Sequence, residues 1–436
     1  MTNVSSEEQS TPSLAPDLLS RAQKAVPVGI TSATSVVNRA LGSHVIDVGG
    51  REVIDFASGI GVLNLGHNNP QVVAAVHEQV DRYLHQCVMV SWYEPYIEVC
   101  ERLARTSPWP DDAKSMLVNS GAEAIENAVK IARFATGRRG VIAFHRGFHG
   151  RTMLALALTG RVRPYKYGFG PFPGEVFHAP APYPYWGIDV SDALRALDDL
   201  FVTEVLPNDV ACIVVEPVQG EAGIVPLGEA FLNGLAARCE RHGILLVVDE
   251  IQCGLRRTGP FWAYEASGIA PDIIVTGKAL GGGFPLAAVI GRSDVMDAVP
   301  SGGFGGTFNG HPVSCAASNA TLSQLVSDSV GERVQEIGAR TAERLAELKA
   351  AHDCIGDVRV AGAMIGIELV EGGPSLPNSQ RAEAVVAAAR DVGVLVLRCG
   401  VHGQVVRLLP PLTISDDELD EGLMLLRDAF AQTEVM

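Results

Sequence analysis

Residues 244–250 read ILLVVDE, and residues 273–283 read IIVTGKALGGG. Each begins with a short apolar run, and residues 211–215 (ACIVV) form a third run of this kind. Such runs are typical of parallel strands buried on both faces. A helical pattern at 230–242 lies between two of them and supplies a crossover. We therefore predict an α/β fold with a mostly parallel central sheet, whose ligands bind where strand carboxyl ends meet loops.

The pattern changes after about residue 312. An Ala-, Leu- and Glu-rich stretch at 314–351 predicts one or two helices. The other elements predicted outside the large sheet are apolar runs at 358–369, 394–397 and 405–409, helices at 381–391 and 416–432, and a hairpin at 45–48 and 52–56. We predict three units: an N-terminal segment (1–62) that packs with the small domain, a large α/β domain (63–320), and a small α+β domain (321–436).

Composition narrows the classes of function. The chain has 436 residues, 47% of them hydrophobic, and a formal net charge of −16. Nucleic acids and anionic membranes attract basic patches, so this charge argues against both as partners. Its eight cysteines are scattered with no Cys-x-x-Cys pair, and no apolar stretch reaches the roughly 20 residues of a membrane helix. We expect a cytoplasmic protein with reduced thiols and small-molecule partners.

Glu216, Asp249 and Lys278 each follow or end one of the apolar runs. Taken singly, Lys278 fits a surface lysine at a strand end equally well, and Asp249 fits a helix cap or a salt bridge. A carboxylate at the end of a buried strand is costly without a cation or protonated nitrogen nearby. Burial lowers the pKa of a lysine and makes its amine nucleophilic. Together, a carboxylate for a pyridinium nitrogen and an amine for an imine are what a pyridoxal phosphate enzyme needs.

A phosphate requires hydrogen-bond donors, and residues 119–123 read NSGAE at the start of a helical pattern. Gly121 and Ala122 are small, so their backbone N–H groups can approach an anion at the helix N-terminus. An ordinary serine cap followed by glycine would have the same sequence. The segment lacks the lysine of a nucleotide-binding loop, which disfavours a nucleotide.

Two arginines stand in aromatic or apolar surroundings. Arg151 follows the triplet FHG, and Arg407 lies inside an apolar run. A guanidinium is rarely buried without a carboxylate, and its planar fork suits carboxylates in bidentate geometry. The alternative for each arginine is an internal ion pair, for which Glu221 is a candidate partner. We expect His149 to be a hydrogen-bonded structural residue.

In order and spacing, several segments resemble the class III pyridoxal phosphate-dependent aminotransferases, and among these the bacterial 4-aminobutyrate (GABA) aminotransferases. The resemblance runs from about residue 21 to the last helix. The segments that carry it are NSGAEA at 119–124, FHGRT at 148–152, EPVQGE at 216–221, DEIQCG at 249–254, RTG at 257–259, Lys278 with its glycines, and GTF at 306–308.

The resemblance implies the type I fold of pyridoxal phosphate enzymes and a role for each matching residue. Lys278 would hold the cofactor as an imine and move the proton, while Asp249 would bind the protonated pyridine nitrogen. A homodimer or a dimer of dimers is implied, because one phosphate contact comes from the partner subunit. The further cofactor contacts implied are Phe148, Ile251, Gln252, Gly121 and Ala122, and Thr307 across the dimer.

The resemblance also implies transfer of an amino group from 4-aminobutyrate to 2-oxoglutarate. Arg151 would bind the distal carboxylate of both substrates, and Arg407 the α-carboxylate that only glutamate and 2-oxoglutarate carry. Glu221 would neutralise Arg407 while 4-aminobutyrate is bound. Glu216 and Ile60 complete the implied substrate site.

Three alternatives remain open from the sequence. In the first, the amino donor is another ω-amino acid, such as 5-aminovalerate or β-alanine. In the second, the donor is an uncharged amine and the acceptor is pyruvate. Arg151 argues against the uncharged amine. The third alternative is a non-catalytic regulatory protein with the same fold, which the presence of Lys278 and Asp249 disfavours.

Overall fold

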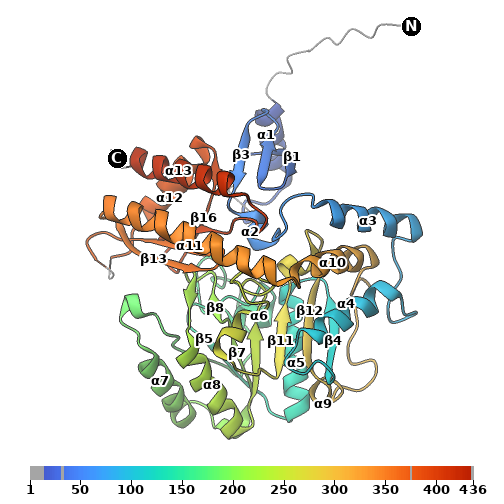
Figure 1. Cartoon of the computed structure of the whole chain (residues 1–436). Coiled ribbons are helices and arrows are strands. Elements are labelled where there is room, and N and C mark those ends of the chain that lie inside the picture. The colour runs from blue at the N-terminus through green and yellow to red at the C-terminus, as the bar shows by residue number, and fades with distance from the viewer. Residues whose placement is uncertain (1–13, 31–33, 374–375, 434–436) are drawn as a thin grey trace, which may run out of the picture.

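The structure of the chain, a computed structural model, describes residues 14–30, 34–373 and 376–433. Its centre is a seven-stranded sheet (Figure 1). All of its strands run in one direction except β12, which is antiparallel to both of its neighbours. In spatial order the strands are β4 (Ala113–Val118), β12 (Ala287–Arg292), β11 (Ile273–Thr276), β10 (Leu245–Asp249), β7 (Val210–Val215), β5 (Gly140–Phe144) and β6 (Val176–Ala179).

The sequence predicts the middle of this sheet correctly. The three apolar runs are β7, β10 and β11, which are neighbours and parallel. Nearly every residue in them is buried, because helices cover the sheet on both faces. The mostly parallel α/β sheet is therefore confirmed.

Separate sets of helices cover the two faces of the sheet. One face packs against α5 (Gly121–Thr136), α6 (Met153–Leu158) and α9 (Ser293–Met296). In α5 the buried residues recur at helical spacing, and they face the sheet. The helices that contribute apolar side chains to the core of the other face are α3 (Pro70–Arg82), α4 (Glu94–Arg105), α7 (Val190–Thr203), α8 (Glu229–His242) and α10 (Pro312–Leu325).

Two smaller sheets lie beyond the central one. The first combines the predicted N-terminal hairpin with a strand from near residue 394, since β3 and β15 are parallel neighbours. The second is antiparallel and carries Arg407 in β17. The first sheet is β1 (Val37–Leu41), β2 (His44–Asp47), β3 (Glu52–Asp55) and β15 (Val394–Leu395), and the second is β13 (Ile355–Ala361), β14 (Met364–Leu369), β17 (Val405–Leu408) and β16 (Leu397–Cys399).

Long helices accompany these small sheets in the upper part of Figure 1. The stretch at 314–351 forms two helices, as the sequence allowed. The helices not yet named are α1 (Leu14–Ala25), α2 (Ser58–Gly61), α11 (Asp328–Ala351), α12 (Ser379–Val392) and α13 (Asp416–Thr433). The remaining short elements are 3₁₀ turns η1 (Pro184–Trp186), η2 (Pro207–Asp209), η3 (Ala263–Ser267) and η4 (Lys278–Gly281), and the hairpin β8 (Val218–Gln219) and β9 (Val225–Pro226).

One predicted run is divided in the structure. The run at 358–369 is a hairpin, β13 and β14, that turns at Gly362. This turn contains only small apolar residues, so it lacks the polar turn residues that mark a hairpin in a sequence.

The division into three units stays a prediction. Its boundary at residue 320 falls within α10, which packs against α3 and α4. The predicted units also include residues 1–13, 31–33, 374–375 and 434–436, which lie outside the described residues.

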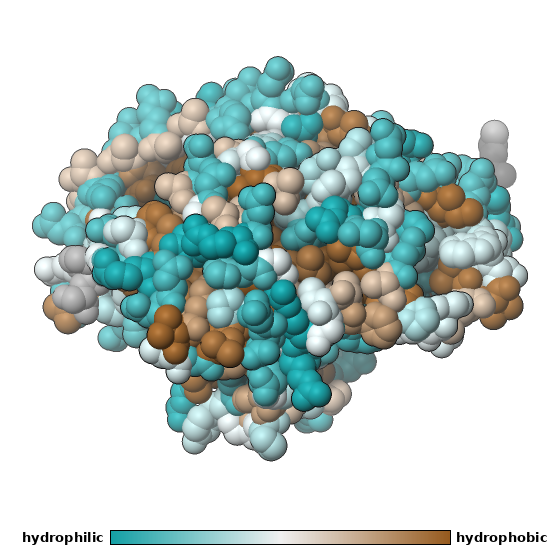
Figure 2. Space-filling view, turned by 90° about the horizontal axis from the view of Figure 1, so that it is seen from below, coloured by the Kyte–Doolittle hydropathy of each residue, from teal (hydrophilic) through white to brown (hydrophobic). Residues whose placement is uncertain are grey.

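Seen from below the view of Figure 1, the surface is mostly hydrophilic, with apolar residues gathered in several patches (Figure 2). Within the described ranges, no helix combines the length and the apolar character needed to cross a membrane.

Candidate active site

The parallel strands bring three charged groups to one edge of the sheet. Asp249 is the last residue of β10, Glu216 directly follows β7, and Lys278 begins η4 just after β11. They line a single cavity of about 190 Å³. The residues around this cavity are Gly121, Ala122, Phe148, His149, Gly150, Glu216, Glu221, Asp249, Ile251, Gln252 and Lys278.

The carboxylate of Asp249 is buried and fixed by two hydrogen bonds. Its Oδ2 lies 2.7 Å from Nδ1 of His149, and its Oδ1 accepts from the backbone N–H of Ile251 at 3.1 Å. Burial opposes the charged form of His149, but the hydrogen bond and charge of Asp249 outweigh it and raise the pKa of the imidazole. His149 is thus a hydrogen-bonded structural residue, as predicted, and it orients the carboxylate of Asp249.

The amine of Lys278 has no hydrogen-bond or ion-pair partner among the described residues. Burial, followed by the nearby charge of Arg407, lowers its pKa. Lys278 also has a left-handed backbone (φ +44°) at the point where the chain leaves β11. Because it is buried beside another cation, Lys278 loses its proton more easily than a lysine in water, and its amine can act as a nucleophile or base.

The N-terminus of α5 closes one side of the cavity. Ser120 caps this 16-residue helix by accepting from the N–H of Glu123 at 3.3 Å. In the described part of the chain, no hydrogen bond uses the N–H of Gly121 or Ala122. A Cβ atom at Gly121 would lie 2.7 Å from Cδ1 of Ile251, so a larger residue here would displace that side chain. The two free N–H groups and the helix dipole suit a phosphate.

The buried carboxyl of Glu216 organises the loops around the cavity. Its Oε2 accepts from the N–H of Phe148 at 2.9 Å, and its Oε1 accepts from the N–H of Gly220 at 3.2 Å. Burial raises its pKa to about 7. Glu216 therefore positions the aromatic wall of the cavity through Phe148.

Glu221, which lines the cavity, forms an ion pair with the buried Arg407. Arg407 Nη1 donates to Glu221 Oε1 at 2.7 Å and lies 3.5 Å from Gln252 Oε1. Burial opposes ionisation of Glu221, but the charge of Arg407 outweighs it and keeps the pKa of this carboxyl below its ordinary value. Arg407 is therefore a buried cation whose counter-ion belongs to a turn, and a substrate carboxylate can replace that counter-ion.

Four predicted site residues do not line the cavity: Arg407, which is paired with the lining residue Glu221, and Arg151, Ile60 and Thr307. Arg151 is exposed, with its guanidinium 4.7 Å from the centre of the Tyr165 ring. Ile60 is 47% exposed and has a left-handed backbone (φ +67°), which is strained for a β-branched residue. Thr307 is exposed in the loop that precedes α10.

Sequence reasoning missed Tyr165. Its hydroxyl donates to Oε2 of Glu221 at 2.9 Å, and its ring centre is 4.9 Å from that of Phe148. The only signal in the sequence is an aromatic residue among arginines in the segment RVRPY (161–165), with no periodicity to indicate which way it faces.

Comparison with known proteins identifies the family. The family model of class III aminotransferases matches residues 25–430. The chain belongs to the class III aminotransferases. This aminotransferase is 47% identical over 416 residues to the 5-aminovalerate aminotransferase DavT of Pseudomonas putida, covering 95% of this chain and 98% of the relative. It is 44% identical over 420 residues to the 4-aminobutyrate aminotransferase GabT of Escherichia coli, covering 96% and 99%.

Solved structures agree with this family. The aminotransferase superposes on a PLP-bound amine transaminase from an uncultivated Pseudomonas species with a TM-score of 0.86 and 28% identity, covering 94% of this chain and 97% of the other. The protein is thus a pyridoxal 5′-phosphate-dependent enzyme of fold type I, and its substrates are small amino and keto acids.

The cavity fits pyridoxal phosphate. It offers free N–H groups at a helix N-terminus for the phosphate, a buried carboxylate for the pyridine nitrogen, and an amine without a partner for the aldehyde. The side chain of Ile251 packs directly against Gly121, so the apolar wall of the cavity lies close to the proposed phosphate site.

Proposed function

We propose that this aminotransferase moves the amino group of 4-aminobutyrate to 2-oxoglutarate, giving succinate semialdehyde and L-glutamate. The carbon that loses nitrogen is oxidised by two electrons, and the keto carbon of 2-oxoglutarate is reduced by two, so no outside oxidant is needed. The observation that carries this proposal is the buried Arg407–Glu221 pair at 2.7 Å beside Lys278. An arginine with a replaceable counter-ion can accept substrates with and without an α-carboxylate in turn.

The residues of the cavity divide the work of the reaction. When bound, the cofactor supplies an aromatic system that takes up the electrons of the bond broken at the substrate carbon. Asp249, oriented by His149, would pair with the protonated ring nitrogen of the bound cofactor. Phe148 and Ile251 would hold the ring between them, and Gln252 would contact its hydroxyl. Nζ of Lys278 takes the proton from the substrate carbon that bears nitrogen, and its lowered pKa favours this basic role.

The phosphate and the substrate carboxylates are held by other groups. Gly121 and Ala122 donate their N–H groups to the phosphate. Arg151 binds the distal carboxylate of both substrates, and Arg407 binds the α-carboxylate of the dicarboxylates. Ile60, at the turn of α2, lies beside the substrate chain.

A second candidate donor is 5-aminovalerate. It is favoured by the relatives named 5-aminovalerate aminotransferase, which are 47% identical to this chain. This donor has one more methylene, and a hydrophobic pocket discriminates one methylene by only about 10- to 200-fold. The two donors must therefore be compared directly.

The test is a single-turnover series with the purified enzyme and pyridoxal phosphate. We expect the cofactor absorbance band to bleach fastest with 4-aminobutyrate, more slowly with 5-aminovalerate and β-alanine, and not with butylamine, which lacks a carboxylate. Faster bleaching with 5-aminovalerate than with 4-aminobutyrate would make 5-aminovalerate the donor. Lys278→Ala is the matched control and must not respond. A wild-type enzyme that bleaches with butylamine as readily as with 4-aminobutyrate, or that ignores all ω-amino acids, would overturn the proposal.

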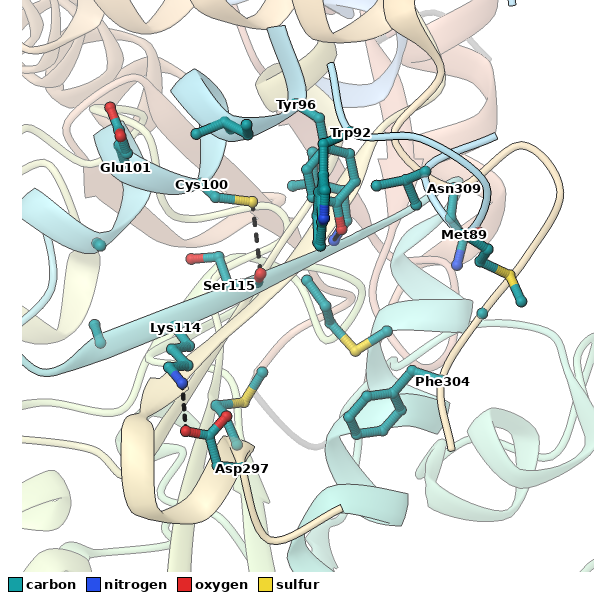
Figure 3. A pocket seen from close by; sticks show the side chains of 18 of the residues that line it. Met89, Trp92, Tyr96, Cys100, Glu101, Lys114, Ser115, Asp297, Phe304 and Asn309 are labelled. Carbon is teal, nitrogen blue, oxygen red and sulfur yellow. Dashed lines mark hydrogen bonds and ion pairs between the residues drawn. The ribbon is translucent and has the colours of Figure 1, made fainter. Parts of the chain in front are cut away.

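We further propose a homodimer or dimer of dimers in which Thr307 of the partner subunit contacts the phosphate. Thr307 lies between Phe304 and Asn309, which line a second cavity of about 770 Å³ (Figure 3). Met89 and Trp92, also labelled there, are 62% and 73% exposed. Large exposed apolar surfaces of this kind are typical of subunit interfaces. Light scattering should give twice or four times the mass of the chain, and an active monomer would contradict the proposal.

The cytoplasm remains the proposed location. Cys212, Cys239 and Cys399 are buried thiols whose pKa values burial raises, so they are unreactive and need no oxidising compartment. Cell fractionation with thiol labelling tests this, and recovery outside the cytoplasm would contradict it.

A further inference from the structure

The carboxylate of Glu221 is held from two sides. Its Oε1 accepts from Arg407 at 2.7 Å, and its Oε2 accepts from the hydroxyl of Tyr165 at 2.9 Å. Tyr165 is 8% exposed, and Arg407 is 3% exposed. A phenol and a guanidinium thus share one carboxylate, and the side chain of Glu221 is itself only 16% exposed.

Tyr165 touches two further residues of the proposed site. Its ring centre lies 4.9 Å from that of Phe148, which we assign to the cofactor wall. The guanidinium of Arg151, which we assign to the distal carboxylate, lies 4.7 Å from the same ring on the solvent side. The one side chain therefore contacts the groups proposed for the cofactor and for the distal carboxylate, and through Glu221 it is connected to Arg407, the group proposed for the α-carboxylate.

We propose that Tyr165 is a positioning residue that lets the enzyme alternate between its two substrates, by holding Glu221 after a dicarboxylate has taken Arg407. This inference rests on the proposed function. When the α-carboxylate of glutamate or 2-oxoglutarate binds Arg407, Glu221 loses its guanidinium partner. A buried carboxylate without a donor is strongly disfavoured. Tyr165 still donates its hydrogen bond to Oε2 of Glu221, so this carboxylate keeps one donor. Glu221 can therefore give up Arg407 to the substrate.

The protonation state of Tyr165 supports this role. Burial and the adjacent charge of Glu221 raise the pKa of the phenol. The hydroxyl therefore stays protonated and donates a hydrogen bond over the whole working range of pH.

The test is Tyr165→Phe, which removes the hydroxyl and keeps the ring against Phe148 and Arg151. A hydrogen bond to a charged group contributes about 1.5–3 kcal/mol, and about 1.4 kcal/mol is tenfold. We therefore expect the half-reaction with glutamate to slow by about 10- to 100-fold. The half-reaction with 4-aminobutyrate should change by less than about threefold, because Arg407 still pairs with Glu221 there.

Two further measurements separate positioning from a general structural effect. In Tyr165→Phe the released Glu221 must take up a proton, so the glutamate half-reaction should slow further as pH rises, unlike in the wild type. In a Glu221→Gln background the same change should have little effect on the glutamate half-reaction, since no charge is left to hold. Tyr167→Phe is the matched control, because Tyr167 is 64% exposed and contacts Arg163 instead.

The inference fails if Tyr165→Phe slows both half-reactions equally, or if its effect persists in the Glu221→Gln background. That outcome leaves the proposed function intact. The proposed function fails separately if the wild-type enzyme does not react with ω-amino acids at all.

Discussion

Nδ1 of His149 lies 2.7 Å from Oδ2 of Asp249, and both side chains are removed from solvent. Because this contact and the N–H of Ile251 hold both carboxylate oxygens, Asp249 presents a fixed carboxylate to the cavity. We expect Asp249→Asn to lower kcat by about 10²- to 10³-fold, the usual cost of removing one preorganised electrostatic group. Steady-state kinetics at saturating cofactor will measure this. An unchanged kcat would show that the carboxylate does not act on the cofactor.

Glu221→Gln should separate the two half-reactions. The variant cannot neutralise Arg407, so a buried cation faces the apolar chain of 4-aminobutyrate, and we expect that half-reaction to slow about 10- to 100-fold. The glutamate half-reaction supplies its own carboxylate to Arg407 and should change little. Rapid-mixing absorbance measurements with each substrate alone will give the rate of each half-reaction. Equal slowing of both would refute the exchange of Glu221 for a substrate carboxylate at Arg407.

Arg151→Met should weaken the binding of the distal carboxylate. We expect KM for 4-aminobutyrate to rise about 10- to 100-fold, from the loss of a charge-assisted contact of about 1.5–3 kcal/mol. Arg163→Met is the control, because Arg163 is exposed and stacks on Tyr167. If both variants have the same KM, Arg151 does not bind the substrate.

Glu250 should make the stability of the enzyme depend on pH. Burial raises its pKa from the ordinary 4.5 to about 7. Between pH 4.5 and about 7, Glu250 keeps its proton in the folded protein and loses it in the unfolded chain. The stability that Glu250 contributes is therefore fully present at low pH and is lost as the pH rises to about 7. Urea unfolding from pH 5 to 8 should show the decline. Glu250→Gln should make it shallower and leave the part that comes from Glu216, whose pKa burial also raises to about 7. Glu240→Gln, on the exposed side of α8, should keep the wild-type slope.

Glu368 stabilises the contact between the second small sheet and the turn that carries Glu221. Its carboxylate pairs with Arg359 at 2.7 Å, and Arg359 donates to the backbone oxygen of Gly223 at 2.8 Å. Removing one partner of a buried pair costs about 3–5 kcal/mol, and we expect that loss in the unfolding free energy of Glu368→Gln. The exposed Glu371→Gln should be neutral, and equal stability of both variants would contradict this.

The strands at the centre of the sheet could be predicted because they are buried on both faces, which leaves an uninterrupted apolar run. The edge strand β4 is different: it begins with partly or fully exposed residues, among them Lys114, so it has no such run. The groups at the strand ends could also be predicted, since parallel strands bring their carboxyl ends together.

Contacts between distant loops could not be predicted. The hydrogen bond from Tyr165 to Glu221 depends on the path of an irregular loop, and the pairing of His149 with Asp249 joins residues 100 positions apart. Local periodicity contains no information about such pairs, because they form only when separate elements pack. The ion pair of Arg359 with Glu368 was missed because the hairpin turn between them lacks polar turn residues.

The position of β12 between β4 and β11 affects how the enzyme is made. Strand β4 (residues 113–118) has β12 (residues 287–292) as its neighbour in the sheet. A ribosome synthesises chains from the N-terminus, so β4 emerges long before the strand that pairs with it. During that interval its backbone donors and acceptors are open to other nascent chains, and a chaperone that shields them would raise the yield of folded enzyme.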